Sequence, residues 1–246
     1  MPIFTVFSLK ANIKFDYFTL MKLYVGMVTL NCFKYTLNTL SSFVTSIPHT
    51  FMILDNNSTD DTRSFLEKWG KLPNHEAIYV SPRVCVAKAW NTLLTLAMHD
   101  KEFKYCYLIN NDIIFEPYVV DHLVTFVEAH PEYKIVSGIN TRDFKKNPGQ
   151  VDENHLDCAA FLITRECIEK VGFFDENFVE AYFEDNDYHQ RVFRAGLKSC
   201  IVSDVGFFHI GSRTIHEGFS KAEQVEHHKN FERNREYFRK KWGFVP

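Results

Sequence analysis

Short apolar runs alternate with amphipathic stretches along the first half of the chain. The apolar runs have the length of buried strands and occupy residues 23–30, 51–54, 77–80 and 105–109. The stretches between them have helical spacing and occupy residues 33–44, 58–69 and 86–98. Strands joined by helices in this way form right-handed β-α-β units. The pattern therefore predicts an α/β fold with a mostly parallel sheet.

The second half of the chain has a more mixed pattern. We expect helices over residues 117–130 and 184–195, and strands at 133–137, 158–163, 198–203 and 206–210. The polar segment 140–155 contains a Pro-Gly pair and is expected to be a loop. Ser220 is expected to cap a charged final helix, and Ser58 or Thr59 to cap the helix that ends at Trp69. No internal repeat or linker breaks the pattern, so we expect one domain over residues 1–246.

Polar side chains stand where the predicted parallel strands end. Asn31, Asp55 and Asp112 each lie at the carboxyl end of one of these runs. Ligands of open α/β sheets bind at the carboxyl ends of the strands. The sequence therefore predicts a ligand site that gathers these residues.

Composition narrows the class of protein. The net charge of −3 argues against a surface built to neutralise phosphates throughout, although a local basic patch stays open. The six cysteines form no CxxC pair, which favours buried free thiols in a reducing compartment. No apolar run reaches the roughly 18 residues of a membrane span, and charged residues interrupt the N-terminal segment. We expect a cytoplasmic protein, with peripheral contact at a membrane left open.

Five short motifs follow one another along the chain. They are DNNSTDDT at residues 55–62, AKAWN at 87–91, LINND at 108–112, GFFDE at 172–176 and FEDND at 183–187. With Arg191, Gly196 and His209 behind them, residues 22–215 resemble a family 2 glycosyltransferase of the rhamnosyltransferase-like branch. The resemblance implies a GT-A fold, which is Rossmann-like, with helices on both faces of a mostly parallel central sheet. It also implies transfer of a sugar from a nucleoside diphosphate to an acceptor hydroxyl.

On this resemblance the chain divides into a nucleotide-binding half, residues 22–112, and an acceptor half, residues 113–215. A C-terminal helix covers 220–243, and residues 1–20 are either an N-terminal extension or an extra edge element. Asp55 either accepts hydrogen bonds from the nucleotide base or caps its own turn. The backbone from Thr29 to Asn31 would line the same pocket. Asn57 and Asn91, inside two of the motifs, are further substrate-binding candidates.

The family carries an Asp-x-Asp motif where this chain has Asn110, Asn111 and Asp112. The resemblance implies that Asp112 binds Mn²⁺ or Mg²⁺ and that Asn110 or Asn111 reaches the ribose. A carboxylate-bound cation neutralises the charge of a diphosphate leaving group. The alternative is a strand-end turn without a ligand. His209 is either a second metal ligand or a structural histidine.

The acidic run at residues 184–187 opens a helix, where the helix dipole alone would favour acids. The resemblance assigns Asp185 as the general base that takes the proton of the acceptor hydroxyl. Glu184 and Asp187 would contact the acceptor or support the structure, and Arg191 would pair with one of the acids. The implied reaction is a single in-line displacement that inverts the anomeric carbon.

The chain departs from the family at two loops. Arg83 and Cys85 stand where the family has an Asn-x-Gly turn, so Arg83 either supplies charge near the diphosphate or lies on the surface. Asp157 replaces a small residue, is a candidate contact of the donor sugar, and lies in a region expected to set specificity. The basic end of the last helix either touches an anionic acceptor or membrane, or is a solvated helix end.

Three functions remain open on the sequence. The first is sugar transfer to a glycan, a lipid-linked glycan or another hydroxyl. The second is a catalytically silent module that binds sugar nucleotides or glycans. The third is transfer of sugar to a modified nucleic-acid base, which the acidic charge balance disfavours.

Overall fold

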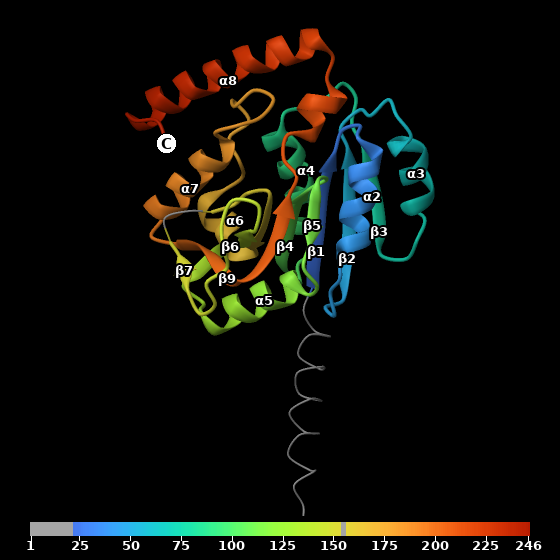
Figure 1. Cartoon of the computed structure of the whole chain (residues 1–246). Helices are drawn as coiled ribbons and strands as arrows, with labels where there is room; N and C mark the ends of the chain where they lie inside the picture. Colours follow the sequence, from blue (N-terminus) through green and yellow to red (C-terminus); the bar gives the residue numbers. More distant parts are fainter. Residues whose placement is uncertain (1–21, 154–155) are drawn as a thin grey trace, which may run out of the picture.

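The computed structural model describes residues 22–153 and 156–246 (Figure 1). The predicted extension at residues 1–20 lies outside them. A nine-stranded sheet runs through the described residues in the order β3-β2-β1-β4-β8-β6-β9-β5, with β7 paired to β9. The predicted α/β class is confirmed.

Four parallel strands form one side of this sheet. They are β1 (Lys22–Thr29), β2 (His49–Asp55), β3 (His75–Tyr79) and β4 (Phe103–Asn110). The register of β1 against β2 runs from Leu23–His49 to Thr29–Asp55, so their carboxyl ends lie level. The helices between these strands are α2 (Phe33–Ser42), α3 (Thr62–Trp69) and α4 (Val86–His99).

The other side of the sheet mixes directions. Its strands are β5 (Ile113–Phe115), β6 (Tyr133–Asn140), β7 (Val151–Asp152), β8 (Ala160–Thr164) and β9 (Lys198–His209). β8 runs antiparallel to both β4 and β6, while β6 and β9 are parallel. The mostly parallel arrangement expected from the sequence is thus a property of the first half. The remaining helices are α5 (Val119–Ala129), α6 (Arg165–Val171), α7 (Glu184–Arg194), the π-helix η1 (Thr214–Gly218) and α8 (Lys221–Trp242).

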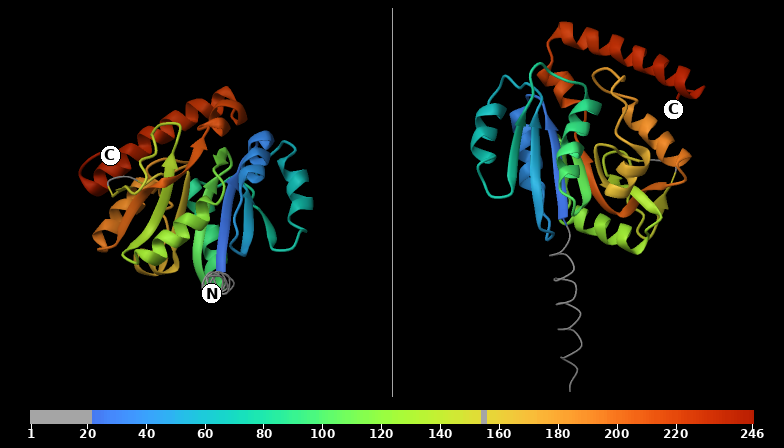
Figure 2. Two further views of the ribbon diagram at one scale, coloured as in Figure 1. Left: turned by 60° about the horizontal axis from the view of Figure 1, so that its bottom comes forward. Right: turned by 180° about the vertical axis from the view of Figure 1, so that it is seen from behind.

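Two apolar cores cover opposite faces of the sheet, as the alternation along β1 requires. Leu23, Val25 and Met27 face the core shared with α3 and α5. Tyr24 and Val28 face the core shared with α4, α6 and α7. Figures 1 and 2 show the resulting three layers. Helices on both faces were expected and are found.

Helix α8 lies outside these layers, across the loop that precedes α7 (Figure 1). Ser220 caps it with a reciprocal capping box to Glu223, as predicted. Phe238 on α8 is fully buried against Phe178 and Phe183 of that loop. A third, small apolar core therefore joins α8 to the acidic end of α7.

Three local predictions need correction. Helix α3 begins at Thr62 and is not capped by Ser58 or Thr59, because Asp55 and Asn31 bind those two residues instead. The two strands expected at 198–203 and 206–210 form one strand, β9, whose irregularity falls opposite Gly138 and Ile139. Strand β7 and helix α6 lie in segments for which the pattern predicted no element.

The cysteines behave as expected for free thiols. All six are unpaired, and Cys106, Cys167 and Cys200 are buried. Burial raises the pKa of the Cys106 thiol well above its ordinary range, which keeps it protonated and unreactive.

Candidate active site

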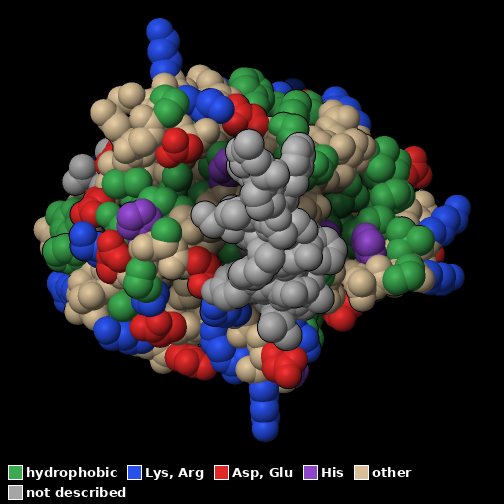
Figure 3. Space-filling view, turned by 90° about the horizontal axis from the view of Figure 1, so that it is seen from below, with side chains coloured by type: hydrophobic (Ala, Val, Ile, Leu, Met, Phe, Trp, Pro, Cys, Tyr) green, Lys and Arg blue, Asp and Glu red, His purple; other side chains and the backbone are tan. Residues whose placement is uncertain are grey.

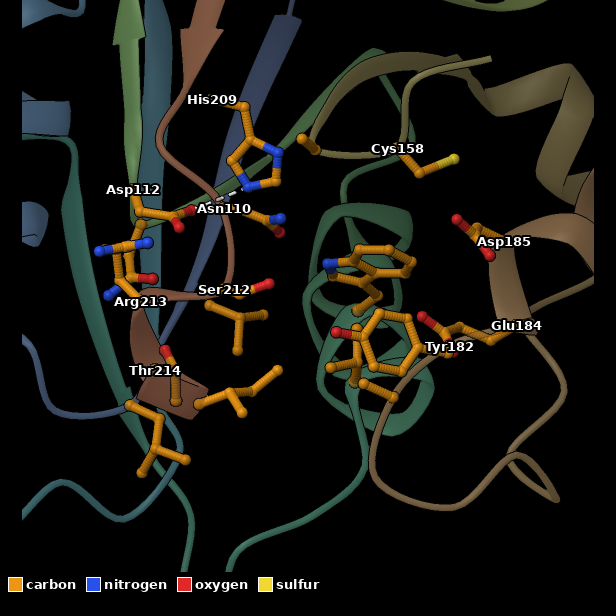
Figure 4. A pocket seen from close by; sticks show the side chains of 18 of the residues that line it. Asn110, Asp112, Cys158, Tyr182, Glu184, Asp185, His209, Ser212, Arg213 and Thr214 are labelled. Atoms are coloured by element: carbon orange, nitrogen blue, oxygen red, sulfur yellow. Dashed lines mark hydrogen bonds and ion pairs between the residues drawn. The ribbon is translucent and has the colours of Figure 1, made fainter. Parts of the chain in front are cut away.

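A cavity of about 480 Å³ opens at the carboxyl ends of β1 and β4. Figure 4 shows its two walls. One carries Asp112, His209 and Arg213, and the other carries Glu184 and Asp185 at the start of α7. Ligand binding at strand ends was predicted, and this is where the structure is hollowed.

Asp112 and His209 form the centre of the first wall. Asp112 follows β4, His209 ends β9, and the pairing of Ile113 with His209 brings them together. His209 Nε2 lies 3.1 Å from Asp112 Oδ1. Burial lowers the pKa of His209, but the hydrogen bond and negative charge of Asp112 outweigh it, so the pKa lies above its usual value.

A carboxylate next to an imidazole is a donor set that Mn²⁺ accepts. Within residues 22–153 and 156–246 no cluster of three or more His, Cys, Asp or Glu side chains could hold a metal. The pair therefore fits a cation that takes its other ligands from substrate oxygens and water. Asn110 and Asn111 both line the cavity, and the amide of Asn111 donates to the hydroxyls of Thr29 and Thr36 at 3.1 and 3.2 Å.

Asp55 is fully buried beneath the cavity and does not line it. Its Oδ1 accepts a hydrogen bond from the backbone N–H of Ser58 at 2.9 Å, and its Oδ2 has no partner. The alternative that Asp55 caps its own turn thus accounts for Oδ1 alone. The other is a buried acceptor that needs a partner.

Several residues assigned to substrate binding on the resemblance do not line the cavity. These are Thr29, Asn31, Asp55, Asn57 and Asn91. Asn91 instead binds the backbone N–H and C=O of Phe174, and Asn31 accepts from the N–H of Thr59. Asn56, which the sequence did not single out, lines the cavity and holds the backbone of Val84 through two hydrogen bonds of 2.9 Å.

Arg83 lines the cavity, but its guanidinium is already paired with two glutamates. Its guanidinium pairs with Glu180 at 3.1 Å and Glu223 at 3.4 Å, and lies 4.6 Å from the ring centre of Phe219. The structure thus favours neither alternative drawn from the sequence, a free surface arginine or a free charge near a diphosphate. Arg213, which the sequence did not single out, stands on the wall of Asp112 and pairs with Glu217. Its position four residues after His209 was the sequence feature that could have identified Arg213 as a site residue.

A strained turn aims the acids of α7 into the cavity. Glu180, Tyr182 and Phe183 all have positive φ angles of 63°, 79° and 72°. Non-glycine residues adopt this region only when surrounding contacts hold them there. Asn234 of α8, which is fully buried, provides such contacts.

The Asn234 side chain makes four hydrogen bonds to this turn. It accepts from the N–H of Val179 at 2.9 Å and donates to the carbonyls of Val179, Ala181 and Tyr182 at 2.8, 2.9 and 3.2 Å. A side chain from α8 thus fixes the backbone immediately before the two acids.

Glu184 and Asp185 are adjacent acids in a dry environment. Burial, and then the charge of Asp185, hold the pKa of Glu184 well above its usual value. Burial also raises the pKa of Asp185, against the hydrogen bond from the N–H of Asn186. Asp157 lines the cavity too, where burial raises its pKa although its Oδ1 accepts from the N–H of Ala159.

Asp187 has a structural place. It is fully buried and binds Arg191 at 2.9 Å, Lys241 at 2.6 Å and the indole N–H of Trp242 at 2.9 Å. The expected pairing of Arg191 with an acid of this run is confirmed.

The family of the chain follows from its sequence match. The sequence model of glycosyl transferase family 2 matches residues 24–191. The chain belongs to this family. A galactofuranosyl glycosyltransferase of Leishmania donovani is 34% identical over 80 residues, which cover 32% of this chain and 18% of that protein.

Solved structures support the same fold. TarS of S. aureus has a TM-score of 0.63 at 16% identity, over 83% of this chain and 41% of that chain. The mannosyltransferase PcManGT from Pyrobaculum calidifontis, in complex with GDP-Man and Mn²⁺, has a TM-score of 0.62 at 15% identity, over 91% of this chain and 65% of that chain. This family 2 chain thus spans less than half of TarS and under a fifth of the Leishmania relative. The likeness to the two structures shows the GT-A arrangement.

In the described part of the chain, no helix has the length and apolar character needed to cross a bilayer. Arg235 and Arg239 on α8 pair with glutamates of the same helix. Figure 3 shows cations and carboxylates interspersed on the visible face at the other end of the molecule. The basic end of α8 therefore carries largely compensated charge.

Proposed function

We propose that this chain transfers a sugar from a nucleoside diphosphate to an acceptor hydroxyl, with inversion at the anomeric carbon. The observation that carries the proposal is the pairing of two different chemistries across one cavity. One wall has a carboxylate–imidazole pair 3.1 Å apart, and the other has the adjacent acids Glu184 and Asp185.

Asp185 is the general base of the proposed reaction. Its raised pKa brings the carboxylate closer to the working pH, which makes it a better acceptor for the hydroxyl proton. As the acceptor oxygen bonds to the anomeric carbon, the bond to the diphosphate breaks on the opposite face. The hydroxyl proton goes to Asp185 and the electron pair of the broken bond goes to the leaving diphosphate.

The first wall receives the diphosphate. A Mn²⁺ or Mg²⁺ held by Asp112 and His209 would neutralise the charge that develops on the leaving group. Arg213 adds a cationic side chain beside them. Asn110 is positioned to contact the ribose, and Asn56 shapes the loop at Val84 that faces the nucleotide.

Asp157 lines the cavity and is proposed to contact the donor sugar. Besides burial, the charges of His209 and Asp143 act on its carboxyl, which supports a position near Asp112 and His209. The nucleoside diphosphate sugars of the comparison structures, such as GDP-Man in PcManGT, indicate the donor class to test.

The test is release of nucleoside diphosphate from UDP-, GDP- and dTDP-sugars with Mn²⁺. We expect the Asp185→Asn variant to lose about 10²- to 10⁴-fold in turnover, because an amide cannot take the proton, while nucleotide affinity stays unchanged. If the unaltered chain released no nucleotide from any donor, it would be a silent binding module. If the turnover of Asp185→Asn equalled that of an active unaltered chain, Asp185 would not be the base.

A further inference from the structure

The charges around the cavity are unevenly paired. Among the described lining residues the arginines are Arg83 and Arg213, and both are bound to glutamates. In the described part of the chain, Glu184 and Asp185 on the α7 wall form no ion pair with a Lys or Arg side chain, and Asp157 also lines the cavity without one. An anionic group placed against this wall would meet like charges whenever these acids are ionised, which disfavours its binding.

Two buried polar atoms at the cavity have no hydrogen-bond partner. They are Oε2 of Glu184 and the indole Nε1 of Trp90, in side chains that are only 5% and 4% exposed. Both side chains line the cavity. A buried group without a partner in a native fold requires an explanation, and a bound ligand provides one.

A hydroxyl group suits such a pair. It can donate to a carboxyl oxygen and accept from an indole N–H, which is a donor only. A phosphate oxygen could accept from the indole, but it has no hydrogen for Glu184 and would face Asp185 as well. The chemistry of the two atoms therefore points to hydroxyls.

Aromatic side chains also line the cavity. Tyr182 and Phe144 keep 36% and 55% of their surface exposed. Trp90 lines it too and packs on Phe161 and Phe174 at ring distances of 5.4 and 5.0 Å. Flat apolar rings at the mouth of a polar site match the C–H faces of a sugar ring.

We propose that the acceptor of this enzyme is an uncharged saccharide, and that the carboxylates around α7 exclude acceptors that carry phosphate or sulfate, nucleic acids included. The inference rests on the proposed transfer reaction. Glu184 and Trp90 would bind hydroxyls of the saccharide, and Tyr182 would pack against its ring.

The experiment compares matched acceptors with a donor that the chain already hydrolyses. Release of nucleoside diphosphate is measured with methyl glycosides and neutral oligosaccharides of mannose, galactose, glucose and N-acetylglucosamine, and with their 6-phosphates. We expect at least one neutral saccharide to raise release about tenfold over water, and its phosphate to leave release at the level of water.

Each outcome is decisive. Faster release with the phosphates or with a short DNA or RNA, or no response to any neutral saccharide, would overturn the acceptor assignment. Hydrolysis of the donor by water would still support the proposed reaction in that case. Absence of donor hydrolysis would instead defeat both.

Variants separate recognition from folding. Glu184→Gln removes an ionisable carboxyl and keeps an oxygen acceptor, so at a pH at which Glu184 is ionised the preference for the neutral saccharide over its phosphate should fall about tenfold. Tyr182→Ala should raise the acceptor KM about tenfold and leave the donor KM in place. Tyr118→Ala and Trp69→Phe are controls, because both side chains lie outside the cavity lining. An unchanged preference in Glu184→Gln would contradict the role of charge.

Discussion

At the residue scale, neighbouring side chains of the same type receive different tasks from their surroundings. Asp187 is neutralised by Arg191, Lys241 and Trp242, and it ties two helices together. Asp185, two positions earlier, lines the cavity and forms no ion pair with a cationic side chain among the described residues. Burial without a counter-charge raises a carboxyl pKa, as at Asp185. In the proposed reaction this difference favours Asp185 as the base, whereas Asp187 links α7 to α8.

Glu184→Gln should stabilise the fold at neutral pH. The pKa of Glu184 is raised by burial in the folded state, so ionisation costs stability as the pH rises above the unfolded value of about 4.3. Glutamine avoids that cost. As the pH rises from 4 to 8, the free energy of unfolding of the variant should therefore increase relative to that of the unaltered chain. The expected difference is about 1 kcal/mol or more, which corresponds to roughly 2–4 °C in Tm.

The measurement is thermal unfolding of both proteins across this range. The exposed Glu232→Gln on α8 serves as the control. Equal melting curves at pH 4 and a widening gap above it are expected, and a gap that is constant or that closes with rising pH would contradict the assignment.

At the element scale, helix α8 contributes to the site although it lies beyond the family match, which ends at residue 191. Asn234 binds the backbone of residues 179, 181 and 182, while Trp242 and Lys241 bind Asp187 on the other side of the two acids. The left-handed residues between these attachment points need external support. We therefore regard Asn234 as a positioning residue for Asp185.

Asn234→Ala should lower turnover about ten- to a hundredfold, because small displacements of a reacting group are costly. Donor-nucleotide affinity should stay the same, since the hydrogen bonds of Asn234 go to the turn before α7 and not to Asp112 or His209. The variant should also lose about 1–3 kcal/mol of stability through three unsatisfied carbonyls and one N–H. Turnover and nucleotide Kd are measured below the melting temperature of each protein.

Glu232→Ala, on the exposed side of the same helix, is the matched control and should behave as the unaltered chain. A parallel loss of nucleotide affinity and turnover in Asn234→Ala would mean that the residue supports the whole fold and not the base.

At the scale of the whole molecule, the sheet joins two walls that are far apart in sequence. Asp112 follows β4, a parallel strand of the first half, and His209 ends β9, which pairs with β5 directly after Asp112. Asp185 comes from a helix on the opposite core. The cavity therefore exists only when both sides of the sheet are assembled, so ligands that fill it should stabilise the entire fold.

Mn²⁺ together with UDP or GDP should raise the unfolding free energy by about 2.7 kcal/mol at a hundred times the Kd. Excess EDTA should remove the metal-dependent part. Asp112→Ala should abolish that part and keep the native melting curve in the absence of ligand to within a few degrees. A stabilisation by Mn²⁺ and nucleotide that persists in Asp112→Ala would show that the cation binds elsewhere.

The sequence by itself determined the alternation of strands and helices, the family, and the strand ends at which polar residues collect. These features depend on local periodicity and on short motifs, both of which can be seen in one dimension. Asp112, His209, Asp157 and Asp185 were found in this way, and all four line one cavity. Their roles, and the division into halves at residue 112, stay predictions.

Only the tertiary structure decided which side chains line the cavity and which partners they bind. Arg83 forms ion pairs with Glu180 and Glu223, which are distant in sequence. Asn91 lies in a motif, yet its side chain binds the backbone of Phe174. Trp90 and Asn234 carry no sequence signal for their positions at the cavity and at the turn. A side chain's charge state and partners depend on packing between elements that are distant in sequence. For this reason the pattern predicted the strand ends correctly, while the walls of the cavity required the assembled fold.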